Sequence, residues 1–409
     1  MGRMFVCQRV TKLCPMGDCG RNLRFMATAA TSVKTESSHK KHNKKDKKLA
    51  ELHKKEKKLL RERLLMANQG TSNSHVYKKL YPWEASEELA EHLRSTQVFH
   101  EDGLIALSKP YGIAMEKVDR PRGAEPHSVV ETVGGGGGGG ANTPAMSQVL
   151  PTLKTLYGVD HLEIVKSTER WSSGLMLLST CSKVTEKVQK CLRRSKTLSQ
   201  PAMTYQAVTL GLPNPATANT KVATKLEYVH DLGNVPVIQK SYSRSAAAKG
   251  EVKPTVVQHR ALVYSKEHDA SLVELKAQVS KWHFLRVWLA YSYSPVLGDH
   301  LYARRVKTLA GRRIQVSPHN VTREPQVLPD TLYSTLALPL RSSELIPCHI
   351  HLSSVTLSQF NKDKSDLVLS APPPEHFKWT CEQLGLEEGS EEENSSESSS
   401  RVASLVQSG

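Results

Sequence analysis

Residues 278–302 read QVSKWHFLRVWLAYSYSPVLGDHLY, and this stretch does more than any other to decide the fold. In its first half Trp282, Leu285 and Leu289 are spaced i, i+3 and i+7, which predicts a short helix with these side chains on one buried stripe. Its second half, PVLGD at 295–299, combines a proline that fixes one dihedral with a glycine that permits a left-handed conformation. The stretch therefore predicts a helix that leads into a tight turn.

Polar residues of the same stretch indicate what this helix and turn are for. His283 and Arg286 are three residues apart, so a helix would place them together on a second face. Asp299 follows Gly298 directly, at a position where aspartate commonly caps a turn. A helix that presents a cation beside a Gly-Asp turn is suited to form one wall of a cleft.

The stretch resembles the third conserved motif of the RluA-type pseudouridine synthases. The family pattern is close to G-R-T-H-Q-I-R-V-H-L-A followed by P-x-L-G-D-x-x-Y, and residues 280–302 keep its spacing. The matching positions are His283, Arg286, Val287, Leu289, Ala290, Pro295, Leu297, Gly298, Asp299 and Tyr302. Within the family, the chain most resembles the animal mitochondrial RNA pseudouridine synthase domain-containing branch.

Three further stretches resemble family motifs and follow the family's order. LIALSKPYG at 104–112 resembles the opening strand and its Lys-Pro-x-Gly turn. MTYQAV at 203–208 resembles the K-T-Y-x-A-x-V strand, with Met203 in place of the lysine, and CHIHL at 348–352 resembles the final strand. The resemblance runs from about residue 96 to about residue 357.

The resemblance implies an α+β pseudouridine synthase fold. Such a fold has a mixed, largely antiparallel sheet with flanking helices and a central RNA-binding cleft, and we expect it to span residues 76–380. Enzymes of the family detach a uracil from its ribose, rotate it and rejoin it through carbon 5. Because this isomerisation is redox-neutral, the resemblance implies no metal and no organic cofactor.

The chain departs from the family at the catalytic motif, H-R-L-D-x-x-T-S-G-L, whose aspartate is the nucleophile and whose arginine assists base flipping. The hinge and strand of this motif are kept as SGLMLL at 173–178. Counting back from them places Lys166, Ser167, Thr168 and Glu169 at the H-R-L-D positions. A carboxylate is therefore retained, one methylene longer than the family's aspartate.

Geometry decides what this change does to catalysis. Reacting atoms must lie about 3–3.5 Å apart, and a misplacement of about 1 Å, roughly the length that one methylene adds, can cost about a hundredfold in rate. Glu169 would still work if the backbone at this position lay farther from the substrate and so offset the longer side chain. Lys166 would supply a charge near the position of the flipping arginine, but without a guanidinium plane.

The remaining site residues are assigned from the resemblance, each against a structural alternative. Tyr205 matches the tyrosine that lies against the target uracil, and the alternative is an aromatic packed in the core. Arg286 matches the cation that pairs with the catalytic carboxylate, and the alternative is a solvated helix arginine. Lys109, Lys166, Lys281 and His283 are predicted to contact RNA, although His283 equally suits a role in the local backbone or the core.

The net charge of +16 is unevenly distributed along the 409 residues. Residues 34–65 hold 13 Lys and Arg against 5 Asp and Glu, and 13 − 5 gives +8. Leucines recur through this segment, so 34–75 is predicted to be a basic helical arm that binds phosphates. The alternative is a solvated, partly disordered arm.

Residues 1–33 have the composition of a mitochondrial presequence. They contain five Lys and Arg and a single acid, Asp18, with no long apolar core. We therefore expect RNA of the mitochondrial matrix as the partner, and the alternative is an ordinary disordered N-terminus. No apolar run of about 18 residues is present, so no membrane span is expected. Seven scattered cysteines support neither a zinc site nor a disulfide framework.

Local patterns predict several further elements. The glycine run 134–140 predicts a flexible loop, and the Glu- and Ser-rich residues 386–409 predict a disordered tail. The predicted elements between them are a helix over 148–157 that stops at Gly158, strands over 162–165 and 175–179, and a helix that Ser182 caps and that continues through Leu192.

Two functions remain open on the sequence. One is a pseudouridine synthase acting on mitochondrial RNA, with Glu169 in the nucleophile's place. The other is a catalytically impaired homologue that acts as an RNA-binding or ribosome-assembly factor, which the replaced catalytic quartet favours. Related sequences that keep a carboxylate at this position would support the enzyme, and random variation there would support the RNA-binding factor.

Overall fold

The computed structural model describes residues 58, 62, 75–116, 144–230, 232–278, 281–321 and 326–387. The predicted presequence, nearly all of the predicted basic arm and the glycine run lie outside these described residues, as do residues 388–409 of the predicted tail. No helix within the described ranges is long and apolar enough to cross a membrane.

An 11-stranded sheet forms the centre of the described chain. In order, its strands are β1 (Gln97–Glu101), β2 (Leu104–Lys109), β4 (Ser173–Ser179), β12 (Ile350–Leu357), β5 (Met203–Leu210), β9 (Ala270–Ala277), β8 (Val252–Ser265), β6 (Thr217–Val229) and β7 (Gly233–Gln239). Strand β3 (Glu163–Lys166) pairs with β4, and β13 (Leu367–Ser370) pairs with β12. The β4–β12 pair is parallel and the other described pairs are antiparallel, as the predicted mixed, largely antiparallel sheet requires.

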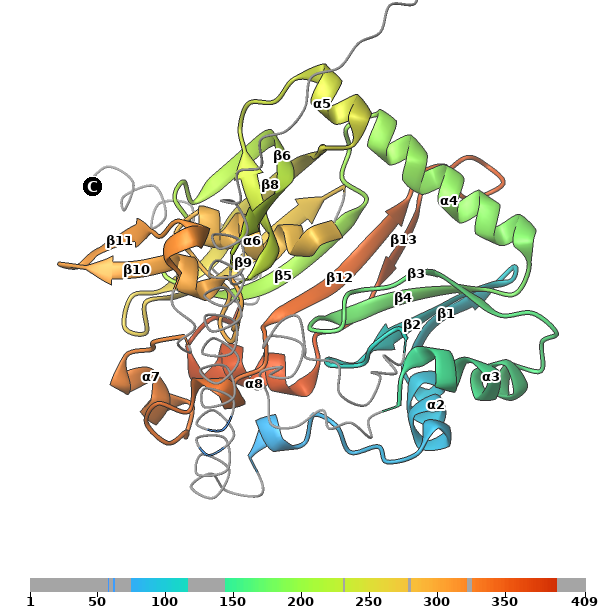
Figure 1. Cartoon of the computed structure of the whole chain (residues 1–409). Helices are drawn as coiled ribbons and strands as arrows, with labels where there is room; N and C mark the ends of the chain where they lie inside the picture. Colours follow the sequence, from blue (N-terminus) through green and yellow to red (C-terminus); the bar gives the residue numbers. More distant parts are fainter. Residues whose placement is uncertain are drawn as a thin grey trace, which may run out of the picture. The chain divides into compact units, whose positions relative to one another are not determined.

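Helices cover the sheet and a separate hairpin projects from it. They are α2 (Ser86–Ser95), α3 (Met146–Tyr157), α4 (Ser182–Thr197), α5 (Arg244–Lys249), α6 (Phe284–Tyr291), α7 (Asp330–Thr335) and α8 (Glu375–Gln383). Figure 1 shows α2 and α3 near one end of the sheet and the hairpin of β10 (Val306–Leu309) and β11 (Arg312–Gln315) near the other. The α+β fold predicted from the motifs is confirmed.

Alternation along β4 explains why helices are needed on both faces. Met176 and Leu178 belong to the core shared with α2 and α3, whereas Leu175 and Leu177 belong to the core shared with α4 and α6. Successive strand residues point to opposite faces, so a strand with apolar side chains on both faces must be covered twice. Every residue of β4 is buried accordingly.

Two glycines allow backbone segments to meet at the site. Gly174 has φ +120°, and a Cβ there would lie 2.3 Å from the carbonyl oxygen of Leu352 in the parallel partner strand. Gly298 has φ +77°, and its Cβ would lie 2.1 Å from the carbonyl oxygen of Pro347. Neither position can accept a side chain unless the backbone moves.

The structure corrects three local predictions. Helix α6 begins at Phe284, because Trp282 and His283 have left-handed φ values of +57° and +53°, so Trp282 is not on the helical stripe. Ser182 does not cap α4 but is its first residue, after an N-cap at Cys181, and the helix continues to Thr197. Helix α8 and a fully buried Leu386 extend the folded chain beyond residue 380.

Other local predictions are confirmed. Helix α3 ends at Tyr157, where Gly158 takes the left-handed C-cap conformation. The strands predicted around the catalytic loop are β3 and β4. Leu285 and Leu289 of the predicted stripe are buried in α6.

Candidate active site

Glu169 lies on the loop 167–172, which joins β3 to β4 and is held through its backbone. The Ser172 backbone N–H and hydroxyl both donate to the Glu169 carbonyl, at 3.3 and 3.1 Å. The Gly112 N–H donates to the Arg170 carbonyl at 2.8 Å, and Arg170 Nε donates to the Gly112 carbonyl at 3.1 Å. The loop is thereby tied to the predicted Lys-Pro-x-Gly turn.

Lys109 strengthens the same connection from inside the protein. Its side chain is 0% exposed, and Nζ donates to the carbonyls of Ser172 and Pro110 at 2.9 and 3.0 Å. Burial lowers the pKa of Lys109 to about 7, although the nearby Glu169 carboxylate opposes this shift. In this structure the buried ammonium bonds backbone carbonyls and holds the loop, and the predicted RNA contact of Lys109 stays a prediction.

On the opposite side of the site, Arg286 forms a buried ion pair with Asp299. The Arg286 Nη2 to Asp299 Oδ1 distance is 2.5 Å, and both side chains are almost fully buried. Asp299 Oδ1 also accepts bonds from the backbone N–H groups of Leu301 and Tyr302 at 2.9 and 3.1 Å, which confirms its predicted turn-capping role. Arg286 is therefore a buried cation and not a solvated one, and Asp299 is its direct partner.

Electrostatics keeps this pair ionised. Burial alone would raise the pKa of Asp299, but the Arg286 charge and the hydrogen bonds to its carboxylate hold that pKa below its ordinary value. Burial alone would lower the pKa of Arg286, and the Asp299 charge instead holds it well above its ordinary value.

Glu169 has a different electrostatic environment. Its carboxylate lies 3.4 Å from the Nε2 atom of His283, and its side chain is 24% exposed. Burial raises the pKa of Glu169 to about 7, and Asp299 adds to the shift while Arg286 and Lys109 oppose it. Near neutral pH the carboxyl group therefore populates both its neutral and its ionised forms.

His283 joins Glu169 to a third side chain. Its Nδ1 atom lies 2.8 Å from the hydroxyl of Tyr302. Burial, with the neighbouring Arg286 charge, lowers the pKa of His283 to about 4, so the imidazole is neutral at physiological pH. His283 therefore faces Glu169 as a neutral ring, at a distance of 3.4 Å and not as an ion pair. The sequence left the role of His283 open between RNA, backbone and core, and did not predict this contact.

Several charged atoms at the site have no hydrogen-bond partner among the described residues. They are Glu169 Oε2, Arg286 Nε and Nη1, and Asp299 Oδ2. Leaving a buried polar group without a partner costs about 1–3 kcal/mol, and more for charged groups. Native proteins tolerate such groups mainly where function needs them, and these atoms belong to the residues that the motifs singled out.

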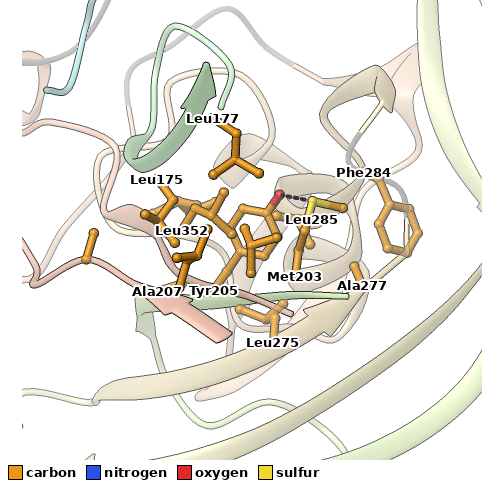
Figure 2. Close-up of a cluster of buried hydrophobic side chains, with 14 of the residues drawn as sticks. Leu175, Leu177, Met203, Tyr205, Ala207, Leu275, Ala277, Phe284, Leu285 and Leu352 are labelled. Carbon is orange, nitrogen blue, oxygen red and sulfur yellow. Dashed lines mark hydrogen bonds between the residues drawn. The ribbon is translucent and has the colours of Figure 1, made fainter. Parts of the chain in front are cut away.

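Tyr205 lies in the core beside the site. The ring is 2% exposed and belongs to a cluster with Leu175, Leu285 and Leu352. Figure 2 shows these side chains around the ring, with the Tyr205 hydroxyl donating to the sulfur of Met203 at 3.5 Å. Met203 occupies the family's lysine position, so this substitution supplies the acceptor. A contact between Tyr205 and a uracil stays a prediction.

Lys166 and Lys281 lie near one another at the ends of two different segments. Lys166 ends β3, and Lys281 is exposed just before α6. Burial lowers the pKa of Lys166, and the positive charge of Lys281 lowers it further. An anionic phosphate would relieve the repulsion between these cations, so their predicted RNA contact is compatible with this placement but stays a prediction.

No family model matches the chain. The chain is 30% identical over 302 residues to mitochondrial mRNA pseudouridine synthase RPUSD3 of Homo sapiens, covering 73% of this chain and 79% of the relative. It is 31% identical over 303 residues to the Mus musculus protein of that name, covering 73% and 80%. It is 23% identical over 314 residues to the Bos taurus protein named pseudouridylate synthase RPUSD4, mitochondrial, covering 74% and 73%.

A solved structure supports the fold independently. It is titled human RNA pseudouridylate synthase domain containing 4, and it aligns with a TM-score of 0.52 at 22% identity, covering 74% of this chain and 97% of that one. At this identity the likeness shows the fold alone. Combined with the 30% identity to the human relative over most of both chains, it means that the chain belongs to the pseudouridine synthase family that its motifs predict.

Proposed function

We propose that this chain is an RNA pseudouridine synthase of the mitochondrial matrix and that Glu169 is its working carboxylate. The observation that carries the proposal is the convergence on Glu169 of a buried Arg286–Asp299 pair and of His283, with charged atoms left without partners in the described chain. The names of the relatives support mitochondrial messenger RNA as the substrate.

The chemistry needs an ionised carboxylate close to the target nucleoside. The bond between N1 of uracil and the ribose breaks, the base rotates, and a new bond forms through carbon 5; carbon 5 releases a proton and N1 takes one up. A carboxyl group with a pKa of about 7 has a substantial ionised fraction at the pH of the matrix and remains a better base than an ordinary glutamate. Because the net reaction is an isomerisation, these residues need no redox partner.

The backbone of the loop supports Glu169 in this role. The bonds from Ser172 to the Glu169 carbonyl, and between Arg170 and Gly112, fix the point from which the longer side chain extends. A fixed starting point allows a carboxylate to be held in a reactive position. Lys166 and Lys281 are assigned to the RNA backbone, where cations position a substrate without reading its sequence.

The test is the release of tritium from mitochondrial RNA labelled at carbon 5 of uridine. We expect release by the wild type, abolition by Glu169→Ala and by Glu169→Gln, and a measurable but altered rate for Glu169→Asp. Glu186→Ala, on the exposed face of α4, is the matched control and should retain the wild-type rate.

Binding measurements with the same RNA separate the competing function. Wild-type protein that binds RNA with a salt-dependent affinity but releases no tritium would be an RNA-binding or assembly factor, and the proposal would be wrong. Release that persists in Glu169→Ala would show that the chain is an enzyme whose working carboxylate is another residue.

A further inference from the structure

Three side chains from separate segments form a continuous chain of contacts that ends at Glu169. Tyr302 follows the Gly-Asp turn, His283 precedes α6, and Glu169 belongs to the loop before β4. The Tyr302 hydroxyl lies 2.8 Å from His283 Nδ1, and His283 Nε2 lies 3.4 Å from Glu169 Oε2. The imidazole thus bridges the two sides of the site.

The contacts at both ring nitrogens favour one tautomer of His283. A neutral imidazole carries one N–H and one lone pair, so one nitrogen donates and the other accepts. The Tyr302 hydroxyl can donate to Nδ1, whereas an ionised Glu169 carboxylate can accept but cannot donate. A proton on Nε2 leaves Nδ1 free to accept from Tyr302 and points an N–H at the carboxylate across 3.4 Å, whereas a proton on Nδ1 would direct a lone pair at the carboxylate.

Other charges near these residues do not take the place of this donor. Glu169 also faces Lys109, Arg286 and Asp299. Lys109 donates to backbone carbonyls and Arg286 Nη2 donates to Asp299. Within the described chain, the neutral His283 places its Nε2 atom 3.4 Å from the Glu169 carboxylate.

The Tyr302 ring is held firmly by cations on its faces. Arg286 and Arg305 lie over it, at 5.2 and 4.8 Å from the ring centre, and the side chain is 6% exposed. Cation–π contacts with a buried ring depend on the ring and not on its hydroxyl. Replacing tyrosine with phenylalanine therefore removes the hydroxyl contact to His283 and leaves the ring in place.

We propose that Tyr302 and His283 are positioning residues, which hold an N–H donor toward Glu169 and thereby stabilise its ionised form. In the family pattern the carboxylate is expected to pair with the arginine at the Arg286 position, but here Asp299 is the direct partner of that arginine. The Glu169 Oε2 atom has no hydrogen bond within the described chain. The neutral histidine, fixed by the tyrosine hydroxyl, instead directs the positive end of an N–H dipole at this oxygen across 3.4 Å. The expected effect of these two residues on the reaction rate rests on the proposed function of Glu169 as the working carboxylate.

The primary experiment compares Tyr302→Phe with the wild type in the tritium-release assay as a function of pH. Loss of the hydroxyl lets the imidazole change tautomer, so the apparent pKa for activity should rise by about 1 unit, with little change in KM or in the rate at high pH. Tyr264→Phe is the matched control, because it removes a hydroxyl bonded to Asp269 on the surface, and its pH profile should equal that of the wild type.

Substitutions of His283 give a second test that depends on the position of the donor. Glutamine can place an amide N–H near the Nε2 position, whereas asparagine places its amide near Nδ1. We expect His283→Asn to lower kcat about tenfold near neutral pH and His283→Gln to recover part of that loss. Equal activity in the two variants would contradict a role for a donor facing Glu169.

A readout that does not need activity separates this inference from the proposed function. Carbon-13 NMR of side-chain carboxyl groups, with the Glu169 signal assigned from its absence in Glu169→Gln, follows the Glu169 pKa directly. A higher pKa in Tyr302→Phe than in the wild type supports the inference even when no tritium is released. An unchanged Glu169 pKa in a folded Tyr302→Phe protein would overturn it.

Discussion

The two sides of the site are held in place by different means. On the side of α6, a buried ion pair between Arg286 and Asp299 joins the helix to the Gly-Asp turn. On the side of Glu169, the loop 167–172 is held by hydrogen bonds that involve backbone atoms of Ser172, Arg170 and Gly112. On the α6 side both partners are charged side chains. On the loop side the acceptors are backbone carbonyls, which both backbone N–H groups and the side chains of Lys109, Arg170 and Ser172 reach.

The motifs on the two sides also diverge unequally. Residues of the α6 side match the family pattern at most positions, and replacing either member of the buried ion pair would strand a charge. Lys166, Ser167 and Thr168 depart from the pattern, whereas the connection of the loop to the turn is made by Arg170 and Gly112. A degenerate quartet is thus compatible with an intact loop, and Glu169 can be tested as a working group.

The largest expected effect, on the free energy of unfolding, comes from a substitution on the α6 side. Asp299→Ala should lower the free energy of unfolding by about 3–5 kcal/mol, because the buried Arg286 guanidinium would lose its partner. Urea denaturation followed by circular dichroism measures this difference.

An exposed ion pair provides the matched control for that change. Asp269 pairs with Arg313 at the surface, where its side chain is 53% exposed. Asp269→Ala should cost at most about 1 kcal/mol, as exposed pairs do. Similar losses in the two variants would contradict the view that the Arg286–Asp299 pair holds the α6 side together.

An intermediate effect is expected on the loop side, in the dependence of the reaction rate on pH. In its proposed role Glu169, with a pKa of about 7, must be ionised to react, so the rate should rise with pH. One unit below that pKa about a tenth of the carboxyl groups are ionised, and the rate should be about tenfold below its plateau. A pH profile of tritium release that is flat around neutrality would show that Glu169 does not titrate in the rate-determining step.

The raised pKa also predicts how stability depends on pH. The folded protein holds the Glu169 proton more tightly than the unfolded chain, so folding stability from this group falls as pH rises from the ordinary carboxyl range toward 7. Glu169→Gln should remove that decline. Unfolding midpoints at about pH 5 and about pH 8, compared between the two proteins, give the measurement.

The smallest expected effect concerns the cations at the edge of the site. Lys281→Ala should weaken RNA binding only a few-fold and reduce the dependence of log affinity on log salt by about 1, as expected for the loss of one phosphate contact. Lys378→Ala, at an exposed position of α8, should leave that slope unchanged. A filter-binding titration over several salt concentrations measures the slope for each variant. Equal slopes for both variants would show that Lys281 does not contact RNA.

Motif spacing predicted much of the fold and several site residues. The strands around 104–109 and 203–208, the turn at Gly298 and the capping role of Asp299 follow from short patterns whose physical basis is local. The sequence did not predict that Asp299 is the partner of Arg286. A family pattern names the residues, but it does not say which of two nearby carboxylates the guanidinium reaches.

One error and one unforeseen burial have a common origin in that limit. Apolar periodicity placed Trp282 on a helix, but periodicity does not report φ, and the left-handed backbone at Trp282 and His283 delays the start of the helix to Phe284. The resemblance placed Lys109 among the RNA contacts but did not foresee that its side chain is 0% exposed and donates to loop carbonyls. Burial of a single side chain is set by chain segments distant in sequence.

The sequence by itself determined the family, the order of the strands' motifs, and a carboxylate retained at position 169, because these depend on residue types at fixed local spacing. The tertiary structure decided which groups meet: Asp299 with Arg286, His283 with Glu169 and Tyr302. It also decided the pKa of Glu169, about 7. Contact and desolvation arise when distant segments pack together, so neither is encoded in any one stretch of the chain.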